Sequence, residues 1–166
     1  MATPENLQAA FAGESQANRT YLAFAEKAAA EGFPQIARLF RAVAAAETIH
    51  AHAHLRVMGR VRSTAENLQS AIAGEAYEFQ KMYPQFVEEA KAESNRAALT
   101  SFNNALAIEK LHHRLYSEAL EMMVAGNDLP SATMYVCDVC GHTVAGDAPD
   151  KCPTCGARKE RFQAIS

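Results

Sequence analysis

Residues 47–50 read Glu-Thr-Ile-His and residues 109–112 read Glu-Lys-Leu-His, so the chain contains the same Glu-x-x-His pair twice. An Ala-Gly-Glu element precedes each pair, at residues 12–14 and 73–75. Residues i and i+3 of a helix share a face, with Cβ atoms about 5–6 Å apart, so each pair can offer an oxygen and a nitrogen to one ion. Two such pairs, with one Glu from each of two other helices, are the pattern of di-iron and di-manganese four-helix bundles. The sequence therefore predicts a mainly α, four-helix domain around a pair of metal ions.

Helix-forming residues dominate the chain up to position 125, with apolar residues spaced by three and four. Pro84 falls inside the third predicted helix and should kink or break it. The first two helices align with the last two, but Glu78 has only Ala17 at the equivalent position, so the second half has a spare carboxylate. The four predicted helices span roughly residues 4–31, 34–58, 63–95 and 96–125.

The repeated acidic residues and histidines are expected to face one bundle core. So many buried charges without partners would be prohibitive, and two cations would remove that cost. Oxygen ligands with a few imidazoles suit iron or manganese better than copper or structural zinc. The predicted ligands are Glu14, Glu47, His50, Glu75, Glu78, Glu109 and His112. The other histidines are expected at the surface: His52, His54, His113 and His142.

All four cysteines lie near the carboxy terminus, as two Cys-x-x-Cys-Gly knuckles. A glycine after the second cysteine lets the chain turn, so that backbone N–H groups reach the sulfurs. Four thiolates fit one iron or one zinc, and the spacing does not choose between them. The predicted ligands are Cys137, Cys140, Cys152 and Cys155. The predicted organisation is a helical domain (1–125), a linker (126–134) and a small cysteine module of short strands and turns (135–166).

Net charge and hydropathy restrict the compartments and the partners that we expect for this chain. A net charge of −3 gives no electrostatic basis for binding nucleic acid or an anionic membrane. No apolar run approaches the roughly 20 residues of a membrane span, and the amino terminus has no signal-peptide pattern. We therefore expect a cytoplasmic protein, in which paired cysteines favour a metal over a disulfide.

The sequence resembles rubrerythrin over nearly its whole length. The resemblance rests on residues 12–15 (Ala-Gly-Glu-Ser), the two Glu-x-x-His pairs and residues 74–78 (Gly-Glu-Ala-Tyr-Glu). Tyr135 and the Cys-Pro-Thr-Cys-Gly knuckle at 152–156 are similar to rubredoxin. The resemblance implies a ferritin-like bundle that holds two iron ions, followed by a rubredoxin-like module that holds one, although zinc remains possible there.

The resemblance also implies individual roles. Glu47 and Glu109 would bridge the two irons, and Glu14 and Glu75 would be terminal ligands, with His112 on the Glu75 iron. On the other iron, a histidine and a glutamate would exchange upon oxidation; here they would be His50 and Glu78. Two tyrosines, each about two helical turns after Glu14 or Glu75, would hydrogen-bond to ligand carboxylates, or would simply pack in the core: Tyr21 and Tyr83.

By the same resemblance, the expected activity is reduction of hydrogen peroxide to water. The tetrathiolate iron would return electrons one at a time, itself reduced by a rubredoxin or a flavoprotein fed from NAD(P)H. Three alternatives stay open. They are iron oxidation and storage, as in ferritins, dioxygen reduction at the same site, and a non-enzymatic interaction protein with a zinc ribbon.

The link between the second and third helices is short. In a ferritin-like bundle these helices run in the same direction, so their link must cross the bundle. A helix of about 25 residues is ~37 Å long, whereas residues 59–62 span at most ~14 Å. We therefore predict a helix-swapped homodimer, in which the first two helices of one chain pack with the last two of another. Fraying of a helix end at the link is the alternative.

Overall fold

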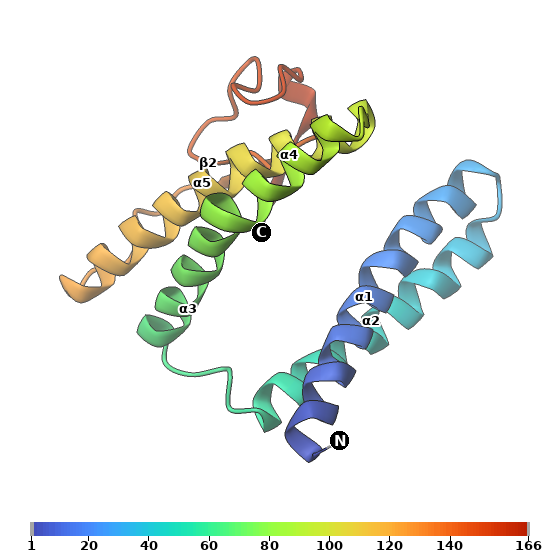
Figure 1. Ribbon diagram of the computed structural model, residues 1–166, viewed down its shortest axis with the longest axis horizontal. Coiled ribbons are helices and arrows are strands. Elements are labelled where there is room, and N and C mark those ends of the chain that lie inside the picture. The colour runs from blue at the N-terminus through green and yellow to red at the C-terminus, as the bar shows by residue number, and fades with distance from the viewer. Residues whose placement is uncertain (1, 166) are drawn as a thin grey trace. The chain divides into compact units, whose positions relative to one another are not determined.

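The computed structural model describes residues 2–165 and divides the chain into two compact units, Met1–Arg62 and Ser63–Ser166. The first unit is an antiparallel hairpin of α1 (Thr3–Ala30) and α2 (Pro34–Val57), drawn in blue and cyan in Figure 1. Large apolar side chains of α2 stay exposed, including Leu39 at 63% and Ile49 at 68%. The buried positions of the hairpin are all alanine: Ala25, Ala28, Ala37, Ala44 and Ala51. Alanines let two helix backbones approach closely, but they leave this unit without a core of its own.

The same turn closes both helical hairpins, as the alignment of the two halves predicts. Gly32 adopts a φ of 85°, and the Phe33 N–H then bonds to the carbonyl of Ala28 at 2.9 Å. In the second half Ser94 has a φ of 57°, and the Asn95 N–H bonds to the Ala90 carbonyl at 2.9 Å. A serine with a left-handed backbone is uncommon. The second half therefore keeps the geometry of the turn although serine replaces glycine.

The second unit begins with α3 (Thr64–Tyr77), continues through a π-helical turn, η1 (Glu78–Met82), into α4 (Tyr83–Ala92), and ends its helical part with α5 (Arg96–Val124). Ser63 caps α3 through a capping box with Glu66. The predicted break at Pro84 is confirmed, because proline has no N–H and its ring collides with the preceding turn. The Tyr83 N–H bonds to the Glu78 carbonyl, at a longer spacing than in an α-helix, so the helix widens here to take in an additional residue.

The cysteine module follows the helices of the second unit. Its antiparallel sheet has the order β2-β1-β3, formed by β1 (Met134–Cys137), β2 (Thr143–Ala145) and β3 (Phe162–Ile165), with a short 3-10 turn, η2 (Lys159–Arg161), before β3. β2 lies against α5 (Figure 1). Half of the buried core residues are cysteines: the core is Cys137, Ala148, Cys152 and Phe162. Among residues 2–165, no helix combines the length and apolar character needed to cross a membrane.

Candidate metal centres

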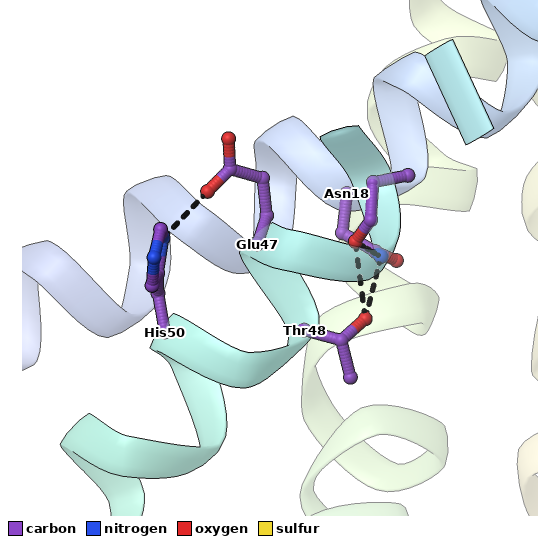
Figure 2. Close-up of polar contacts among 5 residues, drawn as sticks. Asn18, Glu47, Thr48 and His50 are labelled. Carbon is purple, nitrogen blue, oxygen red and sulfur yellow. Dashed lines mark hydrogen bonds and ion pairs between the residues drawn. The ribbon is translucent and has the colours of Figure 1, made fainter. Parts of the chain in front are cut away.

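The first half-site, Glu14, Glu47 and His50, lies on the α1–α2 hairpin. One ligand atom from each residue lies within 4.8 Å of the others. His50 Nδ1 is 2.8 Å from Glu47 Oε2, a contact between residues one helical turn apart (Figure 2). The Glu47 side chain is 16% exposed and that of His50 is 55% exposed. The repeated motif therefore does bring its carboxylate and imidazole together, on a half-open surface.

A polar bridge between the two helices supports this half-site. Asn18 of α1 donates from Nδ2 to the Ala44 carbonyl at 2.7 Å and to Thr48 Oγ1 at 2.8 Å (Figure 2). Thr48 is the neighbour of Glu47 in the sequence, so the bridge fixes α2 against α1 beside the ligand. Sequence reasoning missed this bridge, because neither residue is of metal-ligand type.

The second half-site, Glu75, Glu109 and His112, repeats the arrangement on α3 and α5. One ligand atom from each residue again lies within 4.8 Å of the others. His112 Nδ1 is 3.0 Å from Glu109 Oε2 and 3.8 Å from Glu75 Oε2. The sequence repeat is thus also a repeat of side-chain geometry.

The carboxylates of the second half-site repel one another. Burial raises the pKa of Glu75 to about 7, helped by its hydrogen bond with Glu109 and by the charges of Glu109 and Glu78. Oε2 of Glu75 is buried and has no hydrogen-bond partner in the described part of the chain. A cation would satisfy this oxygen and offset the repulsion, so the donor set fits a hard, oxygen-preferring metal ion.

Glu78 and Tyr83 stand beside the second half-site, at the two ends of the π turn. Burial raises the pKa of Glu78, and the charge of Glu109 adds to this, while His112 opposes it. Burial likewise raises the pKa of Tyr83, together with the charges of Glu109, Glu78 and Glu75. The charges of Glu109 and His112 act on Glu78. Glu78 is nevertheless not part of the group of residues whose ligand atoms lie within 4.8 Å of one another. Single π turns in helices are frequent at functional sites.

The π turn also explains an irregularity in the repeat. The interval from Tyr21 to Tyr83 is longer by a single position than the interval from Glu14 to Glu75. The second half therefore has an additional residue between its glutamate and its tyrosine. The helix widens at this point and takes up the additional residue. Tyr83 therefore occupies the position in the second half that Tyr21 occupies in the first. The changed offset was visible in the sequence, but the π turn was not inferred from it.

Both tyrosines belong to aromatic clusters that repeat with the same offset as the tyrosines themselves. Their ring centroids lie 5.6–6.4 Å apart in the first cluster and 5.5–6.3 Å apart in the second. Within residues 2–165 no hydrogen bond joins either tyrosine hydroxyl to a ligand carboxylate. The clusters are Tyr21, Phe24 and Phe40, and Tyr83, Phe86 and Phe102.

The four cysteines form a compact set of free thiols. Sγ of Cys137 lies 3.7 Å from Sγ of Cys155, and Sγ of Cys140 lies 3.6 Å from Sγ of Cys152. A metal ion with four thiolates at about 2.3 Å has tetrahedral sulfur–sulfur edges of about 3.8 Å, so the set has the size of one such site.

The backbone of each knuckle turns as expected, with φ values of 83° at Gly141 and 75° at Gly156. Burial alone would raise the pKa of Cys152, but backbone N–H groups of Cys155 and Thr154 and neighbouring thiols lower it to about 7. The knuckles therefore already favour one thiolate, as a metal site requires.

The cysteine module touches the second half-site directly. Nε2 of His112 lies 3.3 Å from Oγ1 of Thr143, the first residue of β2. Of the four remaining histidines, which were expected at the surface, His52 is exposed and His54, His113 and His142 are partly exposed. His142 bonds to Thr154 at 3.0 Å, and His113 stacks edge-on against Phe79, because the module and the helices cover them.

Two Glu/His half-sites on repeated helical pairs, joined to a tetrathiolate set, define the class: a carboxylate-type di-iron protein with a ferritin-like fold and a rubredoxin-like module. Comparison with known proteins agrees. The rubrerythrin profile matches residues 5–120, and the profile of the rubrerythrin rubredoxin-like domain matches residues 135–163. The chain belongs to the rubrerythrin family, and it has that family's di-iron and four-cysteine iron sites.

Individual relatives cover nearly the full length. Rubrerythrin-2 of Clostridium acetobutylicum is 36% identical over 98% of this chain and 96% of its own length. Nigerythrin of Nitratidesulfovibrio vulgaris is also 36% identical, over 98% of this chain and 86% of its own. Among solved structures, nigerythrin in its fully reduced, all-ferrous state superposes with a TM-score of 0.59 at 35% identity, covering 99% of this chain and 87% of that one.

Proposed function

We propose that this chain, an iron oxidoreductase of a family tied to oxidative stress, is a non-haem di-iron peroxidase that reduces hydrogen peroxide to water. The observation that carries the proposal is the presence in one chain of two Glu/His half-sites and a tetrathiolate set. An iron-storage protein would have no use for the tetrathiolate set. A zinc-ribbon protein would have no use for the Glu/His half-sites.

The proposed ligands are those of the two half-sites. Glu47 and Glu109 would bridge the ions, and Glu14 and Glu75 would each bind one of them. His112 would bind the Glu75 ion through Nδ1, which faces Glu75 and Glu109. His50 and Glu78 would be alternative ligands of the other ion, a neutral imidazole for its reduced state and an anionic carboxylate for its oxidised state.

Bound iron would supply the two electrons that reduce the O–O bond of peroxide. Formation of two waters from one peroxide also consumes two protons. Within the second unit, Glu78, when it is not bound to the ion, and the Tyr83 hydroxyl stand beside the half-site and would pass these protons. The aromatic clusters around Tyr21 and Tyr83 would hold both rings in place and keep bulk water from the site.

The proposed electron path runs through the cysteine module (135–166), joined to the helical domain (1–125) by the linker 126–134. The tetrathiolate iron would pass electrons singly to the carboxylate site. A rubredoxin or a flavoprotein, supplied by NAD(P)H, would reduce it in turn. The reducing conditions of the cytoplasm, our proposed compartment, would keep the thiols available for metal.

We propose that the working form is a helix-swapped homodimer. α2 is 24 residues long, which at 1.5 Å per residue is about 36 Å, far more than residues 59–62 can span. The exposed apolar side chains of the α1–α2 hairpin also need cover, for example Phe24, Ile36, Leu39 and Ile49. A second copy would provide the missing helices and complete each centre. Light scattering should give a dimer or a multiple of it; a monomer that still holds both carboxylate-site ions would contradict the swap.

The peroxidase proposal is tested by reducing the iron-loaded protein without oxygen and adding one equivalent of hydrogen peroxide. Rapid return of the red ferric tetrathiolate colour is expected, because electrons leave that iron through the carboxylate site. The Glu109→Ala variant, which should keep the tetrathiolate site and lose the bridge, is the control and should recolour slowly. Recolouring only in air would favour dioxygen reduction or iron handling, and a protein that never turns red would have zinc in the module.

A further inference from the structure

The two ring nitrogens of His112 face different parts of the second unit. Nδ1 points to the carboxylates of the half-site, at 3.0 Å from Glu109 and 3.8 Å from Glu75. Nε2 points the other way, to the hydroxyl of Thr143 at 3.3 Å. The His112 side chain is only 27% exposed, so its orientation is set by protein contacts.

The hydroxyl of Thr143 has a second bond that decides the direction of the first. It donates its single hydrogen to the Gly141 carbonyl at 3.0 Å. A hydroxyl has one hydrogen and two lone pairs, so only a lone pair remains for His112. Nε2 must therefore carry the hydrogen in this contact, and the neutral imidazole then presents a free lone pair at Nδ1.

We propose that Thr143 is a positioning residue of the carboxylate site: its hydroxyl accepts the Nε2–H of His112 and so holds Nδ1 ready to bind metal. Histidine ligands commonly need such a partner, which fixes tautomer and ring orientation. What is particular here is its source, because the partner comes from the cysteine module. The inference rests on the proposed role of His112 as a ligand.

The surroundings of the contact strengthen it. Leu115 of α5 and Met134 of β1 line the same pocket as His112 and Thr143. These apolar neighbours lower the local dielectric constant on that side of the contact, which strengthens the hydrogen bond relative to one on a polar surface.

The contact also couples the two metal sites. Gly141 directly follows the ligand Cys140, so the Thr143 hydroxyl is tied to the knuckle itself. Cysteines make up half of the module's buried core, and a module this small depends on its metal for a fixed structure. Filling the four-cysteine site should therefore fix Thr143 in place and raise the metal affinity of the carboxylate site.

The test is Mn(II) binding to full-length protein whose four-cysteine site holds ferric iron and whose carboxylate site has been emptied with a chelator. The electron paramagnetic resonance signal of free Mn(II) reports the affinity without any turnover. Thr143→Val keeps the shape but removes the hydroxyl, and it should weaken Mn(II) binding about 10-fold or more. Thr143→Ser should restore most of the affinity. Thr154→Val, a matched loss of a histidine-bonded hydroxyl in the same module, should have no effect.

Several results would decide the matter. Wild-type affinity in Thr143→Val, or an equal loss in Thr143→Ser, would overturn the positioning role. A changed ferric tetrathiolate spectrum in Thr143→Val, with Mn(II) binding intact, would show that Thr143 serves only the knuckle and would likewise overturn it. Failure of the wild-type protein to bind Mn(II) would overturn the ligand assignment and the proposed function with it.

The coupling has its own test in a chain that cannot fill the module, Cys137→Ser with Cys155→Ser. Mn(II) affinity should fall, and adding Thr143→Val should cost little more, because Thr143 is no longer held in place. The same cost of Thr143→Val with and without the cysteines would overturn the coupling between the sites.

Discussion

The two half-sites have the same ligand contact but different supports. His50 meets Glu47 at 2.8 Å and His112 meets Glu109 at 3.0 Å. The His50 side chain is 55% exposed, and within residues 2–165 its Nε2 has no partner. The His112 side chain is about half as exposed, and both of its ring nitrogens have a polar neighbour: Glu109 at 3.0 Å from Nδ1 and Thr143 at 3.3 Å from Nε2.

Within one chain, this difference separates an imidazole with a polar neighbour at both ring nitrogens from one with a polar neighbour at Nδ1 only. A ligand that must leave its ion during turnover cannot be held at both ends, and His50 is held at one end only. The half that holds its histidine firmly also carries Glu78, the carboxylate without a counterpart in the first half. The asymmetry in structure thus matches the exchange of His50 and Glu78 that we propose.

The largest expected effect separates the two histidines. In the oxidised protein, His112→Ala should lose at least one carboxylate-site iron, because it removes a permanent ligand. His50→Ala should keep both, because Glu78 would be the ligand in that state. Iron analysis, corrected for the tetrathiolate iron, measures the carboxylate-site iron of both variants. Equal losses of iron would contradict the different roles proposed for His112 and His50.

Removing the carboxylate-site metal should destabilise the protein, because the glutamates then repel one another around Oε2 of Glu75, which has no hydrogen-bond partner in the described residues. Metal at a large excess over its dissociation constant, on the order of 100-fold, stabilises the folded state by about 2.7 kcal/mol. Thermal unfolding with and without Mn(II), with the four-cysteine site filled throughout, measures the difference. An unchanged melting temperature would argue against a metal at this site.

Glu78→Ala makes the second half resemble the first, which has Ala17 in that place. Peroxide turnover should fall by about tenfold or more, while the bound iron should remain. Glu88→Ala, which removes an exposed glutamate of α4, is the control and should behave like the wild type. Undiminished turnover in Glu78→Ala would exclude the exchange of ligands.

The smallest effect concerns the bridge that supports only the first half-site. Asn18→Ala removes the hydrogen bonds to Ala44 and Thr48 and should cost about 1–2 kcal/mol of unfolding free energy. Asn103→Ala, an exposed position of α5, should cost almost nothing. Urea unfolding compares them, and an equal cost would mean that the bridge adds no stability.

Most of the helical fold and the pairing within each half-site follow from the sequence. The spacing of Glu47 and His50, repeated at Glu109 and His112, requires a helical face, and the structure confirms the contact in both. The Pro84 break and the Ser63 cap were also predictable, since both depend on local backbone chemistry.

The parts that escaped prediction depend on contacts between residues far apart in the sequence. Asn18 meets Thr48 from the other helix of its hairpin, and His112 meets Thr143 from another module. A serine, threonine or asparagine gives no sign in the sequence of which group it will meet. The π turn is different, because the change of offset between the two halves marks it, and the repeated aromatic clusters could have been found by the same alignment.

The most direct test of the proposed centre is complementation between two inactive chains. Glu47→Ala disables the first half-site and Glu109→Ala disables the second. If each centre combines half-sites of two copies, a mixed dimer has one intact centre; random pairing then restores about one quarter of the wild-type di-iron content and peroxide turnover. If instead each centre uses two half-sites of the same chain, one inactive chain cannot rescue the other. No recovery in the refolded mixture, with both chains folded and dimeric, would therefore contradict the swapped centre.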